Sequence, residues 1–224
     1  MVKLLVDDKE IEVKKGTTLL KACLENDIYI PNLCYMDYVE ANAASCRMCF
    51  VEIEGEEKPV TSCTVKVKGN MIVRTDTPDV RRLQRSAFRL LLSTHHLDCR
   101  NCPANKKCEL QRIAKLLKVG LKQNKLEQIL KDYDIDESHP CLDYFPNRCV
   151  LCGKCIYVCQ KQNGKAIITF AKRGFDTIVS FYGAGNLSAI PCGACNSCIE
   201  ICPVGAITKK GQGLTTNIVE SSSG

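Results

Sequence analysis

The sequence predicts an α+β protein in three parts: a small mixed-sheet domain, a helical segment and a C-terminal repeat. Three observations support this prediction. Short segments within the first 75 residues alternate apolar and polar side chains, as half-buried strands do. Apolar residues recur at helical spacing between residues 79 and 92. One cysteine pattern occurs twice in the last third of the chain, 43 residues apart, which indicates two copies of one unit.

Residues 1–76 are expected to form the mixed-sheet domain. Residues 3–6 and 10–13 have the pattern of two strands in a hairpin, and Thr17 can cap the helix that follows. Strand, strand, helix and more strands in so short a span are typical of a small α+β domain. The further strands are expected at residues 51–53, 65–67 and 71–73.

Residues 77–118 are expected to be largely helical. Pro78 suits the first turn of a helix that runs to residue 92, and a second helix is expected over residues 109–118. The remaining parts are a connector over residues 119–140 with a short helix at 126–130, a repeat domain over 141–212, and a tail over 213–224. We expect the last four residues of the tail to be disordered.

Cysteine dominates the composition, with 17 of 224 residues, whereas tryptophan is absent and aromatic residues make up 6%. The count is odd, the N-terminus lacks the pattern of a secretory signal, and twelve cysteines stand in Cys-x-x-Cys or Cys-x-x-x-Cys groups. Such groups favour metal binding over disulfides, so we expect reduced thiols in a cytoplasmic protein. No apolar run of about 18 residues predicts a membrane span.

The C-terminal repeat carries the most specific motif. Each copy reads Cys-x2-Cys-x2-Cys-x3-Cys; Gln160 follows the first copy, Pro203 follows the second, and 32 residues separate them. Paired four-cysteine zinc sites are one interpretation. The motif resembles that of bacterial two-cluster ferredoxins, in which the fourth cysteine of each run binds the other [4Fe–4S] cluster. The resemblance implies one cluster on Cys149, Cys152, Cys155 and Cys202, and another on Cys159, Cys192, Cys195 and Cys198.

A second group consists of one histidine and three cysteines: His95, Cys99, Cys102 and Cys108. These residue types are also those of a structural zinc site. The spacing resembles the histidine-ligated [4Fe–4S] site in the large peripheral-arm subunit of complex I and in related hydrogenases. The resemblance implies a [4Fe–4S] cluster on these four residues. It selects His95 over the adjacent His96, and we interpret His96 and His139 as surface or structural residues.

A third group lies in the N-terminal domain: Cys34, Cys46, Cys49 and Cys63. Its first gap is longer than in the Cys-x4-Cys-x2-Cys pattern of plant-type [2Fe–2S] ferredoxins. The group resembles the ferredoxin-like β-grasp domain at the N-terminus of the complex I subunit and of NAD-linked or iron-only hydrogenases. The resemblance implies a [2Fe–2S] cluster whose binding loop is residues 45–52; a four-cysteine zinc site is the alternative.

The three groups use 15 cysteines and one histidine, which makes four complete sets of four ligands. Cys23 is expected in the apolar core, and Cys141 has no partner in sequence. Residues 74–125 carry 13 Lys and Arg against 4 Asp and Glu. This basic segment suits cluster charge or an acidic partner subunit at least as well as it suits nucleic acid.

Motifs for bond-making chemistry are absent. The segment 183–185 lacks the third glycine of a dinucleotide-binding loop, and there is no Walker A motif or nucleophile elbow. The chain also ends 22 residues after Cys202, without the catalytic domain of iron-only hydrogenases or the long C-terminal region of the complex I subunit. We therefore expect no catalytic site in this chain.

The span 1–210 resembles the small iron–sulfur subunit in the NAD(P)-linked diaphorase module of soluble hydrogenases and formate dehydrogenases. The resemblance implies one [2Fe–2S] and three [4Fe–4S] clusters. They would relay single electrons between a flavin/NAD(P)-binding subunit and a hydrogenase or formate dehydrogenase catalytic subunit. Alternatives are a free ferredoxin-like carrier, a truncated N-terminal part of an iron-only hydrogenase or complex I chain, and a zinc-structured nucleic-acid-binding protein.

Overall fold

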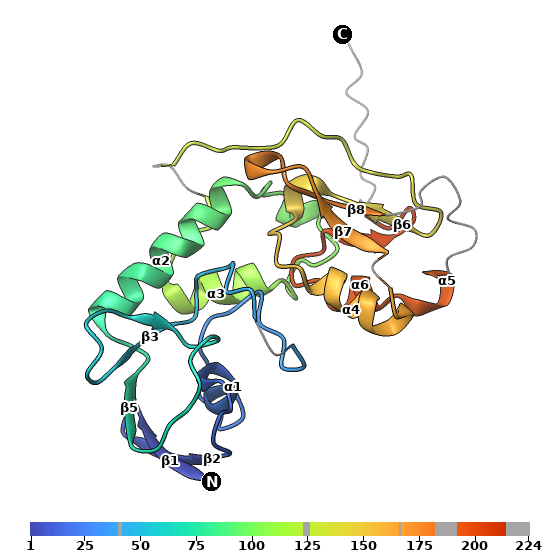
Figure 1. The fold of residues 1–224 in the computed structure, drawn as a ribbon. Helices are drawn as coiled ribbons and strands as arrows, with labels where there is room; N and C mark the ends of the chain where they lie inside the picture. The colour runs from blue at the N-terminus through green and yellow to red at the C-terminus, as the bar shows by residue number, and fades with distance from the viewer. Residues whose placement is uncertain (40–41, 123–125, 166, 182–191, 214–224) are drawn as a thin grey trace. The chain divides into compact units, whose positions relative to one another are not determined.

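The computed structural model describes residues 1–39, 42–122, 126–165, 167–181 and 192–213 (Figure 1). These residues form two compact units. The first consists of residues 1–94 and 112–128, and the second of residues 95–111 and the chain from residue 129 onward. Both units combine short helices with short strands, as the α+β prediction requires. None of the described helices combines the length and apolar character needed to cross a membrane.

The first unit is built on a five-stranded mixed sheet with the strand order β2-β1-β5-β3-β4. Alternate residues of the N-terminal strands, among them Leu4, Val6 and Ile11, are buried while their neighbours are exposed. This alternation directs one face of the sheet into the apolar core. The strands are β1 (Val2–Val6), β2 (Lys9–Val13), β3 (Phe50–Ile53), β4 (Val60–Thr61) and β5 (Met71–Arg74).

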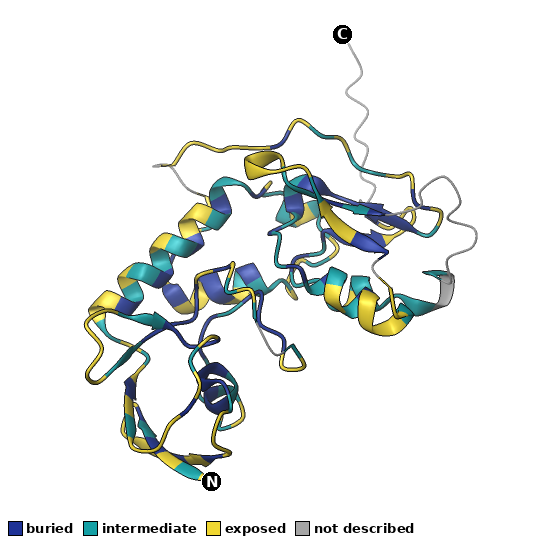
Figure 2. Ribbon diagram, in the orientation of Figure 1, coloured by how far each residue is buried: buried dark blue, intermediate teal, exposed yellow. Residues whose placement is uncertain are grey.

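The pairing of these strands brings distant segments together. β1 and β2 form the predicted antiparallel hairpin, with Val2 opposite Val13. β5 pairs with β1 in parallel and with β3 antiparallel. The short helix α1 (Leu19–Leu24) packs into the same core through Leu19, Leu20 and Cys23, and it is almost entirely buried in Figure 2.

Two local expectations about this domain are wrong. The residue that precedes α1 is Thr18 rather than Thr17, and its side chain makes no capping hydrogen bond. Residues 65–67 are not a strand, because Lys66 meets Thr18 only in an isolated bridge. Their backbone groups bond instead to the start of α1, where Leu19 N–H donates to the Val65 carbonyl over 2.8 Å. Strand β4 was not expected from the sequence, since two residues carry no periodicity.

The predicted helix at residues 79–92 is α2 (Pro78–Ser93). Thr77 caps it, because its hydroxyl accepts a hydrogen bond from Val80 N–H over 3.2 Å, and Pro78 occupies the first turn. The helix expected at residues 109–118 is α3 (Glu109–Leu117). Each helix buries one side, which in α3 is apolar. In α2 the buried side consists of Val80, Gln84, Phe88 and Leu92, whereas Leu90 is exposed, so the helix is confirmed but its buried face differs from the apolar spacing in the sequence.

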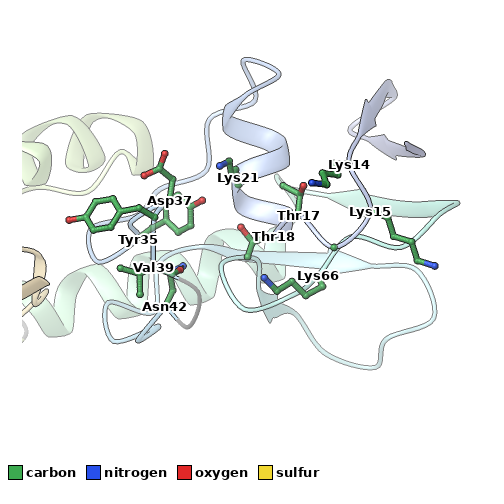
Figure 3. Close-up of a pocket in the computed structure, with 12 residues that line it drawn as sticks. Lys14, Lys15, Thr17, Thr18, Lys21, Tyr35, Asp37, Val39, Asn42 and Lys66 are labelled. Carbon is green, nitrogen blue, oxygen red and sulfur yellow. The ribbon is translucent and has the colours of Figure 1, made fainter. Parts of the chain in front are cut away.

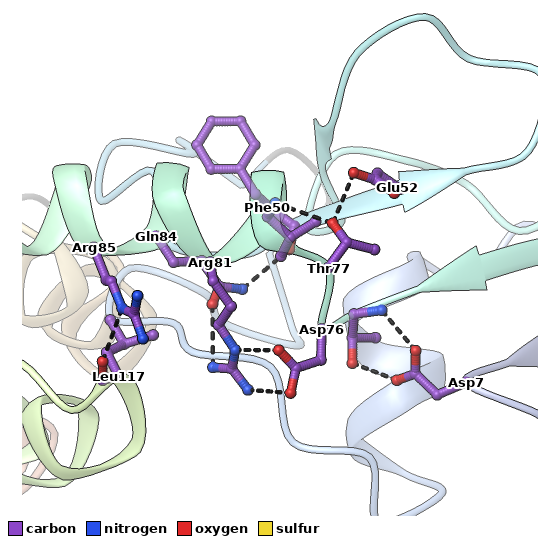
Figure 4. Close-up of polar contacts among 11 residues, drawn as sticks. Asp7, Phe50, Glu52, Asp76, Thr77, Arg81, Gln84, Arg85 and Leu117 are labelled. Atoms are coloured by element: carbon purple, nitrogen blue, oxygen red, sulfur yellow. Dashed lines mark hydrogen bonds and ion pairs between the residues drawn. The ribbon is translucent and has the colours of Figure 1, made fainter.

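Polar contacts fasten α2 to the sheet of the first unit (Figure 4). Thr77 Oγ1 donates to Glu52 Oε1 over 2.7 Å, and the fully buried Gln84 Nε2 donates to the Phe50 carbonyl over 3.2 Å. The start of α2, near residue 77, is therefore held tightly against the sheet. Further contacts at this junction join Asp7 to Thr75, Asp76 to Arg81, and Arg85 to the Leu117 carbonyl.

The second unit consists of two-stranded sheets and short helices around the cysteine motifs. β6 (Leu142–Tyr144) pairs antiparallel with β9 (Ile207–Lys209), and β7 (Ile168–Ala171) pairs antiparallel with β8 (Ile178–Phe181). The helices are α4 (Lys154–Asn163), α5 (Cys192–Cys195) and α6 (Ser197–Glu200), with 3-10 turns η1 (Cys99–Asn101), η2 (Pro146–Arg148) and η3 (Gly174–Asp176). The segment between the two motif copies thus includes β7, η3 and β8.

The connector differs from its expectation. Residues 126–130 are described and form no helix, although the spacing of their apolar residues suggested one. Lys131 is instead held by Asn147, whose side chain bonds both the Lys131 N–H and its carbonyl, over 2.8 Å and 2.9 Å. The glycine-containing segment 183–185 and the expected disordered end of the tail lie outside the described residues.

Candidate metal centres

The structure brings the four cysteines of the N-terminal domain together. Cys34 Sγ lies 3.4 Å from Cys46 Sγ, and the Cys49 and Cys63 side chains also hydrogen-bond each other. Each of the four side chains is at most 6% exposed. All four sequence-predicted residues of this group therefore share one buried location.

Hydrogen bonds within this group favour thiolates at two positions. The hydrogen bond between the Cys34 and Cys46 side chains lowers the pKa of Cys34, and the one between Cys63 and Cys49 lowers the pKa of Cys49 in the same way. The same bonds, together with burial, raise the pKa of Cys46 and Cys63. The thiolate is the form of cysteine that binds metals, so the lowered pKa of Cys34 and Cys49 suits a metal site.

The loop that carries Cys46 and Cys49 is anchored where it enters β3. Arg47 adopts a left-handed backbone conformation, with φ of 52°. Ser62 Oγ donates to the Cys49 carbonyl over 2.8 Å, and Gln84 donates to the Phe50 carbonyl from α2. Neither Ser62 nor Gln84 was predicted from the sequence. Their role depends on tertiary contact, and no spacing in the sequence signals it.

The histidine group lies in the second unit. Cys99 is in η1, and the charges of Cys99 and Cys102 both act on Cys108, so the three cysteines are neighbours. His95 is 7% exposed, and burial lowers its pKa to about 4, with Arg148 among the nearby positive charges that act in the same direction. The imidazole is therefore neutral at pH 7, which is the state that binds metals.

Close backbone packing joins this group to the segment after Cys202. Cys102 Sγ is 3.8 Å from the Val204 carbonyl, and Gly205 has a φ of 65°. A Cβ at Gly205 would stand 2.8 Å from the Ala104 Cβ and 3.6 Å from Cys102 Sγ, so only glycine fits without displacement. The histidine group and the C-terminal motif are therefore adjacent within the second unit.

The eight cysteines of the repeat form two groups. In each group, the first three cysteines of one run lie with the fourth cysteine of the other run. Charge interactions act on Cys155 from the first two cysteines of its own run and from Cys202. They act on Cys198 from the first two cysteines of its own run and from Cys159. Cys155 also interacts with Cys198, so the two groups are close. The groups are Cys149, Cys152, Cys155 and Cys202, and Cys159, Cys192, Cys195 and Cys198.

All four cysteines of the second of these groups line one cavity, whose other walls are largely apolar and include Leu142, Ile168 and Phe181. Polar groups also reach several cysteine sulfurs. Asn163 Nδ2 is 3.5 Å from Cys159 Sγ. The backbone N–H groups of Leu151 and Ala206 donate to the sulfurs of Cys149 and Cys202. Hydrogen bonds to cysteine sulfur adjust the reduction potential of an iron–sulfur cluster.

The donor set favours iron–sulfur clusters or zinc over Mg2+ or Ca2+, because thiolate and imidazole are soft ligands. Within the described part of the chain, no three His, Cys, Asp or Glu side chains converge closely enough to surround one metal ion. The four ligands of a [4Fe–4S] cluster each bind a different iron, and those of a [2Fe–2S] cluster bind its two irons in pairs, so the four ligands need not converge on one atom. Both the buried cysteine groups and their spacing fit such clusters.

Cys23 and Cys141 are not among the predicted ligands, although the charge of Cys141 acts on Cys192. Cys23 is a fully buried core residue, as predicted, and burial raises its pKa to about 12. Cys141 is half-buried, and its N–H donates to His139 Nδ1 over 3.1 Å. His96 is exposed, whereas His139 is buried against Phe181, with 5.0 Å between ring centroids. His139 is therefore structural.

Comparison with known protein families gives two matches. Residues 1–78 match the 2Fe-2S iron-sulfur cluster binding domain. Residues 84–121 match the NADH-ubiquinone oxidoreductase-G iron-sulfur binding region. The matches cover the N-terminal cysteine group and the histidine group.

Curated relatives extend the similarity to the rest of the chain. The chain is 35% identical over 210 residues to the NADPH-Fe(3+) oxidoreductase subunit alpha of Geobacter sulfurreducens, covering 94% of this chain and 24% of that protein. It is 32% identical over 214 residues to the NADP-reducing hydrogenase subunit HndD of Solidesulfovibrio fructosivorans, covering 93% and 36%. The chain thus spans about a quarter to a third of the length of these relatives.

A solved structure matches the whole fold. It is a chain in the crystal structure of an NAD+-reducing [NiFe]-hydrogenase in the H2-reduced state, with a TM-score of 0.82 and 30% sequence identity. The match covers 97% of this chain and 91% of that one. The resemblance inferred from the cysteine motifs therefore extends to the fold, and the N-terminal domain is ferredoxin-like.

Proposed function

This chain belongs to the family of iron–sulfur electron-transfer subunits found in NADH-quinone oxidoreductases and NAD(P)-linked hydrogenases, and we propose that it relays single electrons through one [2Fe–2S] and three [4Fe–4S] clusters. The relay connects a flavin/NAD(P)-binding subunit with a hydrogenase or formate dehydrogenase catalytic subunit. Catalysis of the terminal reactions belongs to those subunits. The reduced thiols of this chain suit a cytoplasmic setting.

Four sets of residues would hold the clusters. The [2Fe–2S] cluster takes Cys34, Cys46, Cys49 and Cys63, and one [4Fe–4S] cluster takes His95, Cys99, Cys102 and Cys108. The other two [4Fe–4S] clusters take Cys149, Cys152, Cys155 with Cys202, and Cys192, Cys195, Cys198 with Cys159. We assign these sets to residues 1–76, 77–118 and 141–212, with residues 119–140 as a connector and residues 213–224 as a tail.

The exchanged grouping of the repeat cysteines is the observation that supports this proposal most strongly. Charge interactions associate Cys202 with the first motif and Cys159 with the second. Independent zinc sites would need no such exchange, because each run already contains four cysteines. Two interlocked clusters in one small domain provide adjacent redox centres, which an electron relay requires.

The chain's own residues set the environment of each cluster. When bound, an iron–sulfur cluster takes up and releases one electron at a potential set by ligand type, hydrogen bonding and burial. The N-terminal cysteines exclude water, because each is at most 6% exposed. The neutral His95 contributes one negative charge fewer than a thiolate, and this change alone makes reduction at its site easier.

Metal analysis tests the cluster content. The full chain, reconstituted anaerobically with iron and sulfide, is expected to hold about 14 iron and 14 sulfide per chain, the sum for one [2Fe–2S] and three [4Fe–4S] clusters. Electron paramagnetic resonance after reduction is expected to show signals from more than one cluster. Stoichiometric zinc without sulfide would contradict the proposal and support the zinc alternative.

Two double variants test the ligand exchange. If Cys149 and Cys202 share a cluster, Cys149→Ala with Cys202→Ala removes one cluster, and iron falls by about 4 per chain. The matched variant Cys149→Ala with Cys159→Ala then removes two clusters, and iron falls by about 8. The reverse order of losses would contradict the exchange while leaving the relay itself intact. Cys23→Ala, in the apolar core of the other unit, serves as the control, with no expected loss of iron from the repeat.

Partner identification tests the place of the chain in a complex. Purification of the native complex is expected to recover a flavin-containing subunit and a catalytic subunit together with this chain. Sequencing of the full reading frame separates this reading from the alternative that the chain is the electron-input part of a longer hydrogenase or complex I polypeptide. The second candidate has specific support, because the curated relatives are several times longer than this chain.

A further inference from the structure

A cavity of about 340 Å3 lies in the N-terminal domain, outside all four ligand groups (Figure 3). Among the described residues, its walls come from the turn after β2, the start of α1, residues 35, 37–39 and 42, and Lys66. Pockets for small molecules usually measure about 300–1,000 Å3. The cavity is thus large enough for a small ligand.

Positive charge is concentrated around this cavity. Its lining includes four lysines and one carboxylate, that of Asp37. Residues 1–73 as a whole carry 9 Lys and Arg against 12 Asp and Glu. The described lining is therefore positively charged within a domain whose net charge is negative. In Figure 3 the Lys15 side chain points away from the other three lysines, and an anion bound between those three would be attracted to each ammonium group. The lysines are Lys14, Lys15, Lys21 and Lys66.

Hydroxyl groups form the inner wall of the cavity. Thr18 is 9% exposed and Tyr35 is 8% exposed, and their side chains hydrogen-bond each other. The backbone around them is held firmly, because Val67 N–H donates to the Thr17 carbonyl over 2.8 Å. Asn42 fixes the opposite wall by accepting a hydrogen bond from Met36 N–H over 2.9 Å. The lining is therefore preorganised.

We propose that this lysine pocket binds the phosphate group of a small phosphorylated molecule of about nucleotide size. Lysine ammonium groups bind phosphate as point charges, and the threonine and tyrosine hydroxyls supply neutral hydrogen bonds to the same oxygens. An acidic protein surface would suit a flat basic patch, whereas this site is concave with buried hydroxyls. Tyr35 directly follows Cys34, so the ligand would bind one residue from a proposed [2Fe–2S] ligand.

Isothermal titration of the anaerobically reconstituted chain with ADP, and separately with inorganic pyrophosphate, tests the proposal. The test variant is Lys14→Gln with Lys66→Gln. The matched control is Lys3→Gln with Lys9→Gln, which removes the same charge from positions in the same domain that do not line the cavity. We expect the test variant to bind at least about tenfold more weakly and the control to change by less than about twofold.

Several outcomes would overturn the proposal. These are the absence of binding at millimolar ADP and pyrophosphate, an equal loss in both double variants, and lysine-dependent binding of an acidic protein without binding of either phosphate compound. Binding of ADP but not pyrophosphate would identify a nucleotide as the source of the phosphate and would support the site. The visible spectrum of each variant checks that the [2Fe–2S] domain is folded.

Discussion

The cysteine groups of the two units are held in different ways. The N-terminal group is buried beside a five-stranded sheet that has an extensive apolar core of its own. Most cysteines in the second unit are half-buried, and they are carried by loops, by α4 and by helices of four residues. The strands of this unit are paired only in twos. Such short elements are marginal without additional contacts. The comparison indicates that the first unit folds around its apolar core, whereas the second depends on the clusters proposed for it.

Removal of iron is expected to have the largest effect and to separate the two units. Chelation should abolish hydrogen-exchange protection in β6, β9 and α4, because the cysteine groups would no longer be joined through a metal core. Protection in β1, β2 and α1 should largely persist, since each buried Leu, Val or Ile there contributes about 1.5–3 kcal/mol. Equal loss of protection in both units would show that the distinction is wrong.

Gly205→Ala is expected to produce the next largest effect, confined to the second unit. The added Cβ meets Ala104 at 2.8 Å, at a backbone φ of 65°. Gly174→Ala is the matched control, because it has a φ of 61° but open space around it. We expect a cost of about 1–2 kcal/mol for the control from backbone strain alone and a larger cost at Gly205, measured by chemical denaturation of the holo-protein. Equal costs would mean that the Ala104 contact yields easily.

Gln84→Leu probes the first unit. Loss of the hydrogen bond to the Phe50 carbonyl leaves a buried acceptor unpaired, and we expect a loss of about 1–3 kcal/mol in stability. The paramagnetic signal of the [2Fe–2S] cluster should shift while the [4Fe–4S] signals stay unchanged, since Phe50 follows Cys49. Arg82→Gln, which removes an exposed ion pair with Asp79 from the same helix, is the control and should cost less than about 1 kcal/mol. A shift in the [4Fe–4S] signals would contradict a local role.

His139 gives the smallest expected effect, a pH dependence of the second unit. Burial lowers the pKa of His139 in the folded state, so the unfolded chain binds a proton at higher pH than the folded chain does. The stability contributed by neutral His139 is therefore present above about pH 6.5 and is lost as the pH falls toward the lowered pKa. The share of the slope that comes from His139 stays below about 1.4 kcal/mol per pH unit, the limit for one proton, and the buried His95 adds slope of the same sign. His139→Gln should flatten it in denaturation curves between pH 7 and pH 5; an unchanged slope would assign the effect to other groups.

The N-terminal hairpin, α2 and α3 follow from local signals. The signals are the alternation in β1 and β2, the helix start at Thr77–Pro78 and the apolar spacing in α2. Each lies within a short stretch of sequence, so the corresponding element forms in the folded chain. The strand expected at residues 65–67 failed because its hydrogen bonds go to the start of α1, a partner that no local pattern identifies. The helix expected at residues 126–130 failed because apolar spacing alone does not supply a surface to pack against.

The sequence by itself determined which ligand chemistry this protein can offer, because residue type and close spacing are covalent properties. Pairs such as Cys46 and Cys49, or Cys99 and Cys102, stay within reach of one another in any conformation. Only the tertiary structure decided which distant residues join them. Cys202 beside the first motif, Gln84 on the Phe50 carbonyl, and lysines from three segments around one cavity all require folding. Contacts between residues far apart in the chain depend on packing, and packing leaves no periodic trace in the sequence.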